Sequence, residues 1–378
     1  MNYPILTFIA LVFILCKHAP AQDLDQFDQL FRQGNYKGAA AEIETRISAK
    51  AGAVPSIYYY KQAEVYYVLF TSSSKTNQEH IMKAQEAALN YVKSPDFSTS
   101  GAEMKQFAGT IARECYKSGA EAFNNSNFVN AQECFTRAAE IFEILKDFND
   151  IQKLWYYLAV SCQYNKDSEN ALKYFKILAD HNYRDQNVYL NLSDLYKAKG
   201  TYPEALAILK KLIDFYPENK NYYELIQVLY EMNEKEQALE YIRNFNASGR
   251  YDTDVSMLEG TMYYEKAQND SALFAFKRIV KNEPDNANAS FNAGIILYNS
   301  ALKHMKTAEQ KYYDNPEKYN REKDQYLIKI KEAAVLLENA YKYDKENKNL
   351  MLALSDIYKR LQRDNEYQSL QNALKKIE

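Results

Sequence analysis

The stretch YLNLSDLYKAKGTYPEALAILKKLIDFYP, residues 189–217, decides the fold. It contains two short amphipathic segments joined near Gly200, because apolar residues recur every three or four positions on each side of this glycine. Ser193 is the small residue of the first segment and Ala205 that of the second, with Leu209 one helical turn further on. The block therefore predicts a helical hairpin in which small residues let the backbones approach and large residues fill the adjacent space.

The same arrangement recurs along the chain at steps of about 34 residues. In each copy an alanine is followed four residues later by a large apolar residue and preceded by a small or apolar residue in the first segment. The recurring alanines are Ala131, Ala171, Ala205, Ala238 and Ala272. Each hairpin has a second apolar face that only a neighbouring hairpin can bury, so the sequence predicts a stack of helix pairs.

This pattern resembles that of the tetratricopeptide repeat family. The 187–217 unit matches the family pattern at nearly every signature position, 107–146 and 252–284 match well, and 152–182 and 220–247 match less completely. The resemblance implies an all-α fold, a right-handed α-solenoid of stacked antiparallel helix pairs.

The pattern is looser at both ends of the chain. Gly34-Asn35-Tyr36 indicates the turn of an early unit, and 57–70 with 80–91 indicates another pair. Near the C-terminus, residues 299–331 form an insertion relative to a 34-residue period. We interpret it as two lengthened helices with a turn near Asp314-Asn315-Pro316, followed by a last pair at 349–361 and 365–377. Residues 22–378 are thus predicted to form about eight to nine helix pairs.

The first 21 residues are predicted to be a signal peptide. Residues 5–15 are apolar apart from Thr7, and Ala19-Pro20-Ala21 is the small–x–small pattern of a cleavage site. Retention as an anchor and lipidation at Cys16 remain alternatives. All three readings predict export, and we expect a periplasmic or outer-membrane-associated protein of a Gram-negative bacterium with no membrane span in the mature chain.

Composition and motifs argue against several classes of function. A net charge of −3 provides no basic field for nucleic acid. His80, His181 and His304 lie far apart, and no glycine-rich phosphate loop or G-x-S-x-G motif occurs. We therefore expect no enzyme activity, no metal and no cofactor.

Three cysteines follow the predicted signal peptide, and an odd number cannot all pair within one chain. Cys115 and Cys134 fall on the two helices of one unit, so a disulfide between them is one interpretation. The alternative is that Cys115, Cys134 and Cys162 are small buried core residues.

The family resemblance implies a binding surface, because in this family the first helix of each pair lines a concave groove. Transferring that geometry gives mainly aromatic candidates, which suit partner binding since they bury a large area with few rotatable bonds. The candidate groove residues are Tyr116, Phe123, Tyr156, Tyr164, Tyr223, Tyr230, Tyr264, Phe291 and Tyr298. The Lys and Asn residues with which some family members clamp a terminal carboxylate are mostly missing at these positions.

The sequence thus predicts a protein–protein interaction scaffold or adaptor in the bacterial cell envelope, binding a segment of an unidentified protein. Two alternatives remain open. One is a periplasmic protein whose tyrosines stack on glycans or peptidoglycan fragments. The other is a structural subunit of a secretion or outer-membrane assembly complex that uses the outer face.

Overall fold

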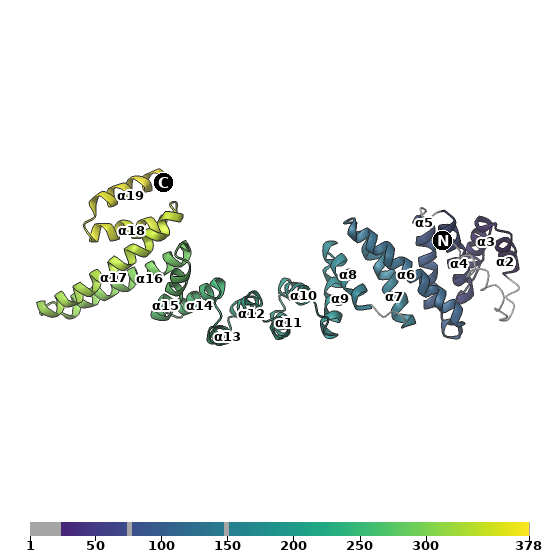
Figure 1. Ribbon diagram of the computed structural model, residues 1–378, viewed down its shortest axis with the longest axis horizontal. Helices are drawn as coiled ribbons and strands as arrows, with labels where there is room; N and C mark the ends of the chain where they lie inside the picture. Colours follow the sequence, from purple (N-terminus) through teal and green to yellow (C-terminus); the bar gives the residue numbers. More distant parts are fainter. Residues whose placement is uncertain (1–23, 74–77, 147–150, 378) are drawn as a thin grey trace. The chain divides into compact units, whose positions relative to one another are not determined.

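The computed structural model describes residues 24–73, 78–146 and 151–377, so the predicted signal peptide and its boundary lie outside the described residues. Within the described residues the regular structure consists of eighteen α-helices, α2 to α19, and one short 3-10 helix (Figure 1). The all-α fold expected from the sequence is confirmed. The chain divides into two compact units, the first ending at Lys199 and the second beginning at Gly200.

The first unit is a succession of helices in which each packs against the next, and the helices α4, α6 and α8 also contact one another in series. Its elements are α2 (Asp25–Arg32), α3 (Tyr36–Ser48), α4 (Ser56–Ser72), α5 (Gln78–Lys93), η1 (Phe97–Thr99), α6 (Ala102–Asn124), α7 (Phe128–Leu145), α8 (Ile151–Tyr164), α9 (Ser168–Asp180) and α10 (Gln186–Ala198).

The second unit continues the pattern, with contacts between sequential helices and between α12 and α14. Its elements are α11 (Tyr202–Phe215), α12 (Asn219–Glu231), α13 (Lys235–Ala247), α14 (Thr253–Glu265), α15 (Asn269–Asn282), α16 (Ala287–Lys311), α17 (Pro316–Tyr343), α18 (Lys348–Arg360) and α19 (Asp364–Ile377).

The tight turns inside the pairs have a common construction. The turn between α2 and α3 contains Gly34 at φ +74°, and the next residue, Asn35, caps α3 by accepting a hydrogen bond from the backbone N–H of Gly38 at 3.0 Å. In the turn between α8 and α9, Lys166 has φ +61° and Asp167 caps the second helix. A left-handed residue followed by a capping side chain ends one helix and starts the next within a few residues.

The predicted contact between a small residue and a large one is present at three helix crossings. A methyl group at Gly119 would lie 2.8 Å from the Phe135 ring, and one at Gly260 would lie 2.6 Å from the Phe276 ring. A methyl group at Gly294 would likewise lie 2.7 Å from the Leu337 side chain. The three glycines therefore let paired helices approach to a distance at which a Cβ atom does not fit.

The pair α16–α17 is longer than the others. α16 has 25 residues and α17 has 28, and the turn between them precedes Pro316, the first residue of α17. The cap of α17 is Asn315, which accepts a hydrogen bond from the backbone N–H of Lys318 at 3.1 Å. Proline suits the first helical position because its missing N–H has no partner there.

Candidate partner-binding surface

In the first unit, Tyr157 of α8 joins aromatic residues of α6 and α7. Its ring stacks on Phe135 with 5.7 Å between centroids and 16° between planes, and it meets Phe123 edge-on at 5.3 Å. Tyr116 lies 6.4 Å from the same ring. Each aromatic pair of this kind contributes about 0.5–1.5 kcal/mol beyond the area it buries. Tyr116 and Phe123, two of the predicted groove residues, are thus held in one cluster.

The cluster reaches the surface at Tyr164, the last residue of α8. The Tyr164 side chain is 62% exposed, and its ring stacks on Phe128 with centroids 4.2 Å apart and planes within 11°. Phe128 in turn meets Phe123 edge-on at 5.5 Å. A continuous series of rings therefore runs from the interior of α6–α8 to an exposed tyrosine.

A network of amide hydrogen bonds fixes the base of this stack. Nδ2 of Asn165 donates to the backbone oxygen of Phe128 at 2.9 Å and to Oε1 of Gln132 at 2.7 Å. Nε2 of Gln132 then donates to Oδ2 of Asp167 at 2.6 Å. Hydrogen bonds from Asn170 hold the pKa of Asp167 below its ordinary value, so the carboxylate accepts as an anion. The stacked rings are therefore positioned before any partner binds.

Tyr156 extends the aromatic surface toward the end of the first unit. Its ring lies 6.0 Å from that of Tyr183, and burial, with the nearby charge of Asp185, raises the pKa of Tyr156. Beside it, Nε2 of Gln163 donates to Oδ1 of Asn191 on α10 at 3.3 Å. The first helices α8 and α10 thus present amide groups next to the aromatic side chains.

In the second unit the predicted residues are more dispersed. The Tyr230 hydroxyl donates to Oε1 of Glu265 at 2.6 Å, and Nζ of Lys235 lies 2.8 Å from the other oxygen of that carboxylate. Tyr264, next to Glu265, is 48% exposed. Tyr223 is half-buried, and burial raises its pKa. Among the predicted residues of this unit, Tyr264 is therefore an exposed one.

The last two predicted residues take part in internal packing. Phe291 packs against the buried cluster that α16, α17, α18 and α19 share. The Tyr298 hydroxyl donates to Oδ2 of Asp356 on α18 at 2.5 Å, and burial and this contact raise the pKa of Tyr298 to about 12. The hydroxyl of Tyr298 is thus already engaged within the chain.

We expect Tyr298→Phe to lower the stability of the second unit by about 1 kcal/mol, the usual net value of one hydrogen bond. Burial opposes ionisation of Asp356, but hydrogen bonds from Arg360 and Tyr298 outweigh it and lower the pKa of Asp356. The stability that this carboxylate contributes is present above the ordinary Asp pKa and is lost as pH falls through the lowered one. The difference between wild type and Tyr298→Phe in urea unfolding should therefore shrink in acid, and a constant difference would contradict this.

Sequence reasoning did not select Tyr157 and Phe128, although both are central to the cluster. Phe128 is the first residue of α7, directly after the capping Asn127. Tyr36 and Tyr202 hold the same position in α3 and α11. An aromatic residue directly after the turn was therefore a usable signal. Tyr157 gave none, since its importance depends on the packing of α8 against α7.

The three cysteines among the described residues, Cys115, Cys134 and Cys162, are unbridged, so the predicted Cys115–Cys134 disulfide is not present. Cys115 and Cys162 are buried and Cys134 is half-buried, and burial raises the pKa of the Cys162 thiol to about 12. Such thiols behave as core residues and react slowly. Across residues 24–73, 78–146 and 151–377, no group of three or more His, Cys, Asp or Glu is placed to hold a metal, and no helix is long and apolar enough to span a bilayer.

Residues 156–220 match the model of the tetratricopeptide repeat family. This segment contains the unit whose sequence pattern is most complete, and the family resemblance is confirmed there. A comparison with curated proteins finds no match.

Several solved structures are similar to the chain. A TPR repeats protein from Bacteroides fragilis NCTC 9343 is 19% identical over 66% of this chain and 98% of its own, with a TM-score of 0.33. YrrB, a TPR protein with an unusual peptide-binding site, is 23% identical over 59% of this chain and 97% of its own, with a TM-score of 0.37. MamA from Desulfovibrio magneticus RS-1 is 19% identical over 52% of this chain and 98% of its own, with a TM-score of 0.36.

Proposed function

We propose that this tetratricopeptide repeat chain is a non-enzymatic scaffold or adaptor that binds a protein segment along its first helices. The observation that carries the proposal is the aromatic series of the first unit, which ends at the exposed and firmly held ring of Tyr164. A rigid aromatic side chain that is already positioned loses little conformational entropy when it anchors a partner.

The groups beside Tyr164 suit an extended peptide. A peptide in extended form carries backbone N–H and C=O groups that need hydrogen-bond partners when they leave water. Gln163 and Asn191 each offer both a donor and an acceptor and lie on neighbouring first helices. Aromatic contacts would supply affinity and amide contacts would fix the register of the segment.

We further propose that this scaffold works in the bacterial cell envelope, in the periplasm or at the outer membrane. The support is the sequence of residues 1–21, with its apolar run followed by Ala19-Pro20-Ala21. An envelope protein is accordingly the partner class that we expect.

Site-specific photocrosslinking in living cells tests both parts of the proposal. A photoreactive phenylalanine analogue is introduced at Tyr164, Tyr264 or Phe274, three exposed aromatic positions. Tyr264 and Phe274 form a matched pair, because they lie on the first and second helix of the pair α14–α15. We expect a discrete crosslinked protein from the first-helix positions Tyr164 and Tyr264, recovered in the envelope fraction, and none from Phe274.

The other outcomes favour other functions. A crosslink from Phe274 alone would favour a structural subunit that uses its second helices. No protein crosslink, together with affinity of the purified chain for peptidoglycan fragments, would favour glycan binding. Recovery of the chain and its crosslinked partner from the cytoplasmic fraction would contradict the envelope location while leaving the scaffold proposal standing.

A further inference from the structure

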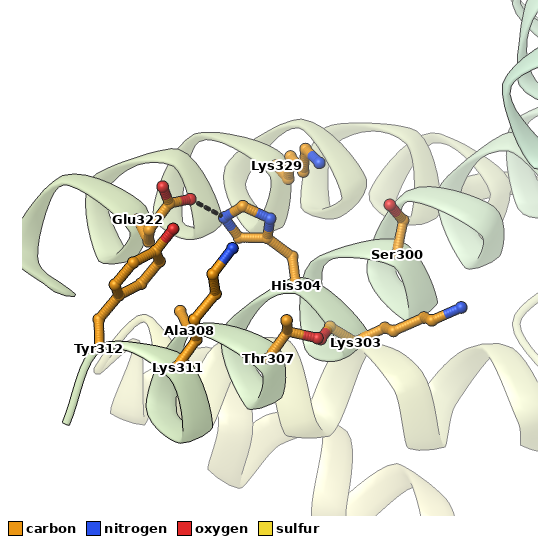
Figure 2. Close-up of a pocket in the computed structure, with 9 residues that line it drawn as sticks. All are labelled: Ser300, Lys303, His304, Thr307, Ala308, Lys311, Tyr312, Glu322 and Lys329. Carbon is orange, nitrogen blue, oxygen red and sulfur yellow. Dashed lines mark hydrogen bonds and ion pairs between the residues drawn. The ribbon is translucent and has the colours of Figure 1, made fainter. Parts of the chain in front are cut away.

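The lengthened pair α16–α17 contains a cavity of about 350 Å³ between its helices. This is near the lower end of the roughly 300–1,000 Å³ typical of small-molecule sites. Its lining comes from one face of α16 and the start of the next turn, and from two positions of α17 (Figure 2). The lining residues are Ser300, Lys303, His304, Thr307, Ala308, Lys311, Tyr312, Glu322 and Lys329.

The charge of this lining is mainly positive. Lys303, Lys311 and Lys329 belong to it, and among the described residues none of the three has a carboxylate within ion-pair distance. Lys235, Lys266 and Lys277 of the second unit do have one, as with Lys235 and Glu265 at 2.8 Å. In residues 299–331, Lys and Arg outnumber Asp and Glu by eight to five, although the whole chain has a net charge of −3. Figure 2 shows Lys311 running toward His304 and the Lys303 side chain running the other way, toward the start of α16. Positive side chains around one cavity that lack counter-charges favour a bound anion.

The one carboxylate in the lining faces a histidine. Oε2 of Glu322 lies 2.9 Å from Nε2 of His304, a contact that becomes an ion pair when the imidazole is protonated. Figure 2 shows the Lys311 side chain running from α16 toward this pair, with the Tyr312 ring beside Glu322. Nζ of Lys311 lies 5.4 Å from the centroid of Tyr312. Glu322 is therefore directed at His304, and Lys311 and Lys329 have no carboxylate partner among the described residues.

We propose that this cavity binds a phosphate group, either free or at the end of a small soluble phosphomonoester. Lysines bind phosphate as compact point charges, and the Ser300 hydroxyl can add a neutral donor from the same face of α16. The Thr307 hydroxyl already donates to the backbone oxygen of Lys303 at 2.9 Å. The cavity is larger than a phosphate ion needs, so the remaining volume accommodates a short polar substituent. This site is independent of the peptide-binding surface proposed above.

Titration calorimetry with the full mature chain tests the proposal, using inorganic phosphate, glycerol 3-phosphate and glycerol as ligands. The test variant replaces the three lining lysines, K303Q, K311Q and K329Q. The control variant carries K306Q, K323Q and K331Q, which change the charge by the same amount at exposed positions of the same helix pair outside the cavity lining. Circular dichroism and thermal unfolding show whether both variants keep the wild-type fold.

For each phosphate compound, we expect the affinity of the control variant to lie within about twofold of the wild-type affinity. The test variant should bind each compound at least about tenfold more weakly than wild type, equivalent to about 1.4 kcal/mol. Tighter binding of glycerol 3-phosphate than of phosphate would identify a monoester as the ligand. Equal weakening in both variants would indicate diffuse charge attraction and overturn the proposal, as would binding of glycerol or failure of wild type to bind either phosphate compound.

Glu322→Gln gives a second readout that does not depend on removing lysines. This substitution keeps the shape of the side chain and removes the negative charge from the lining. We expect phosphate to bind several-fold more tightly to this variant, since a like charge near the anion is lost. Unchanged or weaker binding would show that the anion does not occupy this cavity.

Discussion

Gly119→Ala should leave the chain less stable than Gly109→Ala by about 1–3 kcal/mol, the usual cost of overpacking. Both glycines are buried on α6. A Cβ atom at Gly119 would lie 2.8 Å from two atoms of the Phe135 ring, whereas one at Gly109 would lie no closer than 3.5 Å to any side chain. Alanine improves helix propensity by about 1 kcal/mol at either site, so the difference between the variants isolates the clash.

The Phe135 ring cannot move away easily. It is fully buried and packs between Tyr116 and Tyr157, with ring centroids at 5.8 Å and 5.7 Å. Urea unfolding followed by far-UV circular dichroism measures the difference, and Gly109→Ala should match or exceed wild type. If the two variants unfold at the same urea concentration, the helices α6 and α7 do not cross at Gly119 as described.

The crossings could be predicted from the sequence because they depend on local spacing. In each pair, the small residue of the first helix meets the large residue that follows the recurring alanine of the second helix by four positions, because both lie at the same distance from the turn. Gly260 with Phe276 and Gly294 with Leu337 follow this rule, and the second crossing survives the lengthening of α16 and α17. The extra residues lie at the end of α16 and the start of α17, next to the connecting turn, and they lengthen both helices together. The register at the crossing of Gly294 and Leu337 is therefore unchanged.

The binding surface could be predicted only in part, because periodicity indicates which face of a helix a residue occupies but not what that residue contacts. Tyr164 and Tyr298 both qualified as first-helix aromatics, yet one is largely exposed and the other donates a hydrogen bond to Asp356. That partner lies 58 residues away in the sequence. No pattern within a single repeat reveals such a contact, since it depends on the packing of a later helix.

The polar lining of the α16–α17 cavity also depends on contacts between distant residues, so it could not be predicted from the pattern of one repeat. His304 and Glu322 lie on different helices and come together only because the two lengthened helices run antiparallel over extra turns. In the sequence, the segment 299–331 is rich in charge, which is also typical of solvated helices. That Lys303, Lys311 and Lys329 line one cavity became evident only from the side-chain positions.

Arg278→Met should destabilise the second unit by about 3 kcal/mol, the lower end of the cost of breaking a buried ion pair. Nη2 of Arg278 on α15 donates to Oε2 of Glu259 on α14 at 2.6 Å and to the Ser256 hydroxyl at 2.8 Å. Glu259 is only 7% exposed, and its other hydrogen bond within the second unit comes from Asn246 at 3.4 Å. Without the arginine, a nearly buried carboxyl group is left with one weak hydrogen-bond partner.

The neighbouring Lys277 provides the matched control. It pairs with Glu332 of α17, but both side chains are more than a third exposed, so Lys277→Met should cost less than about 1 kcal/mol. The double variant Arg278→Met with Glu259→Met should recover most of the loss, because two apolar side chains of similar volume replace the pair and no charge remains buried. Equal urea midpoints for Lys277→Met and Arg278→Met would contradict a structural role for the buried pair. A double variant no more stable than Arg278→Met would show instead that the arginine acts mainly through packing of its side chain.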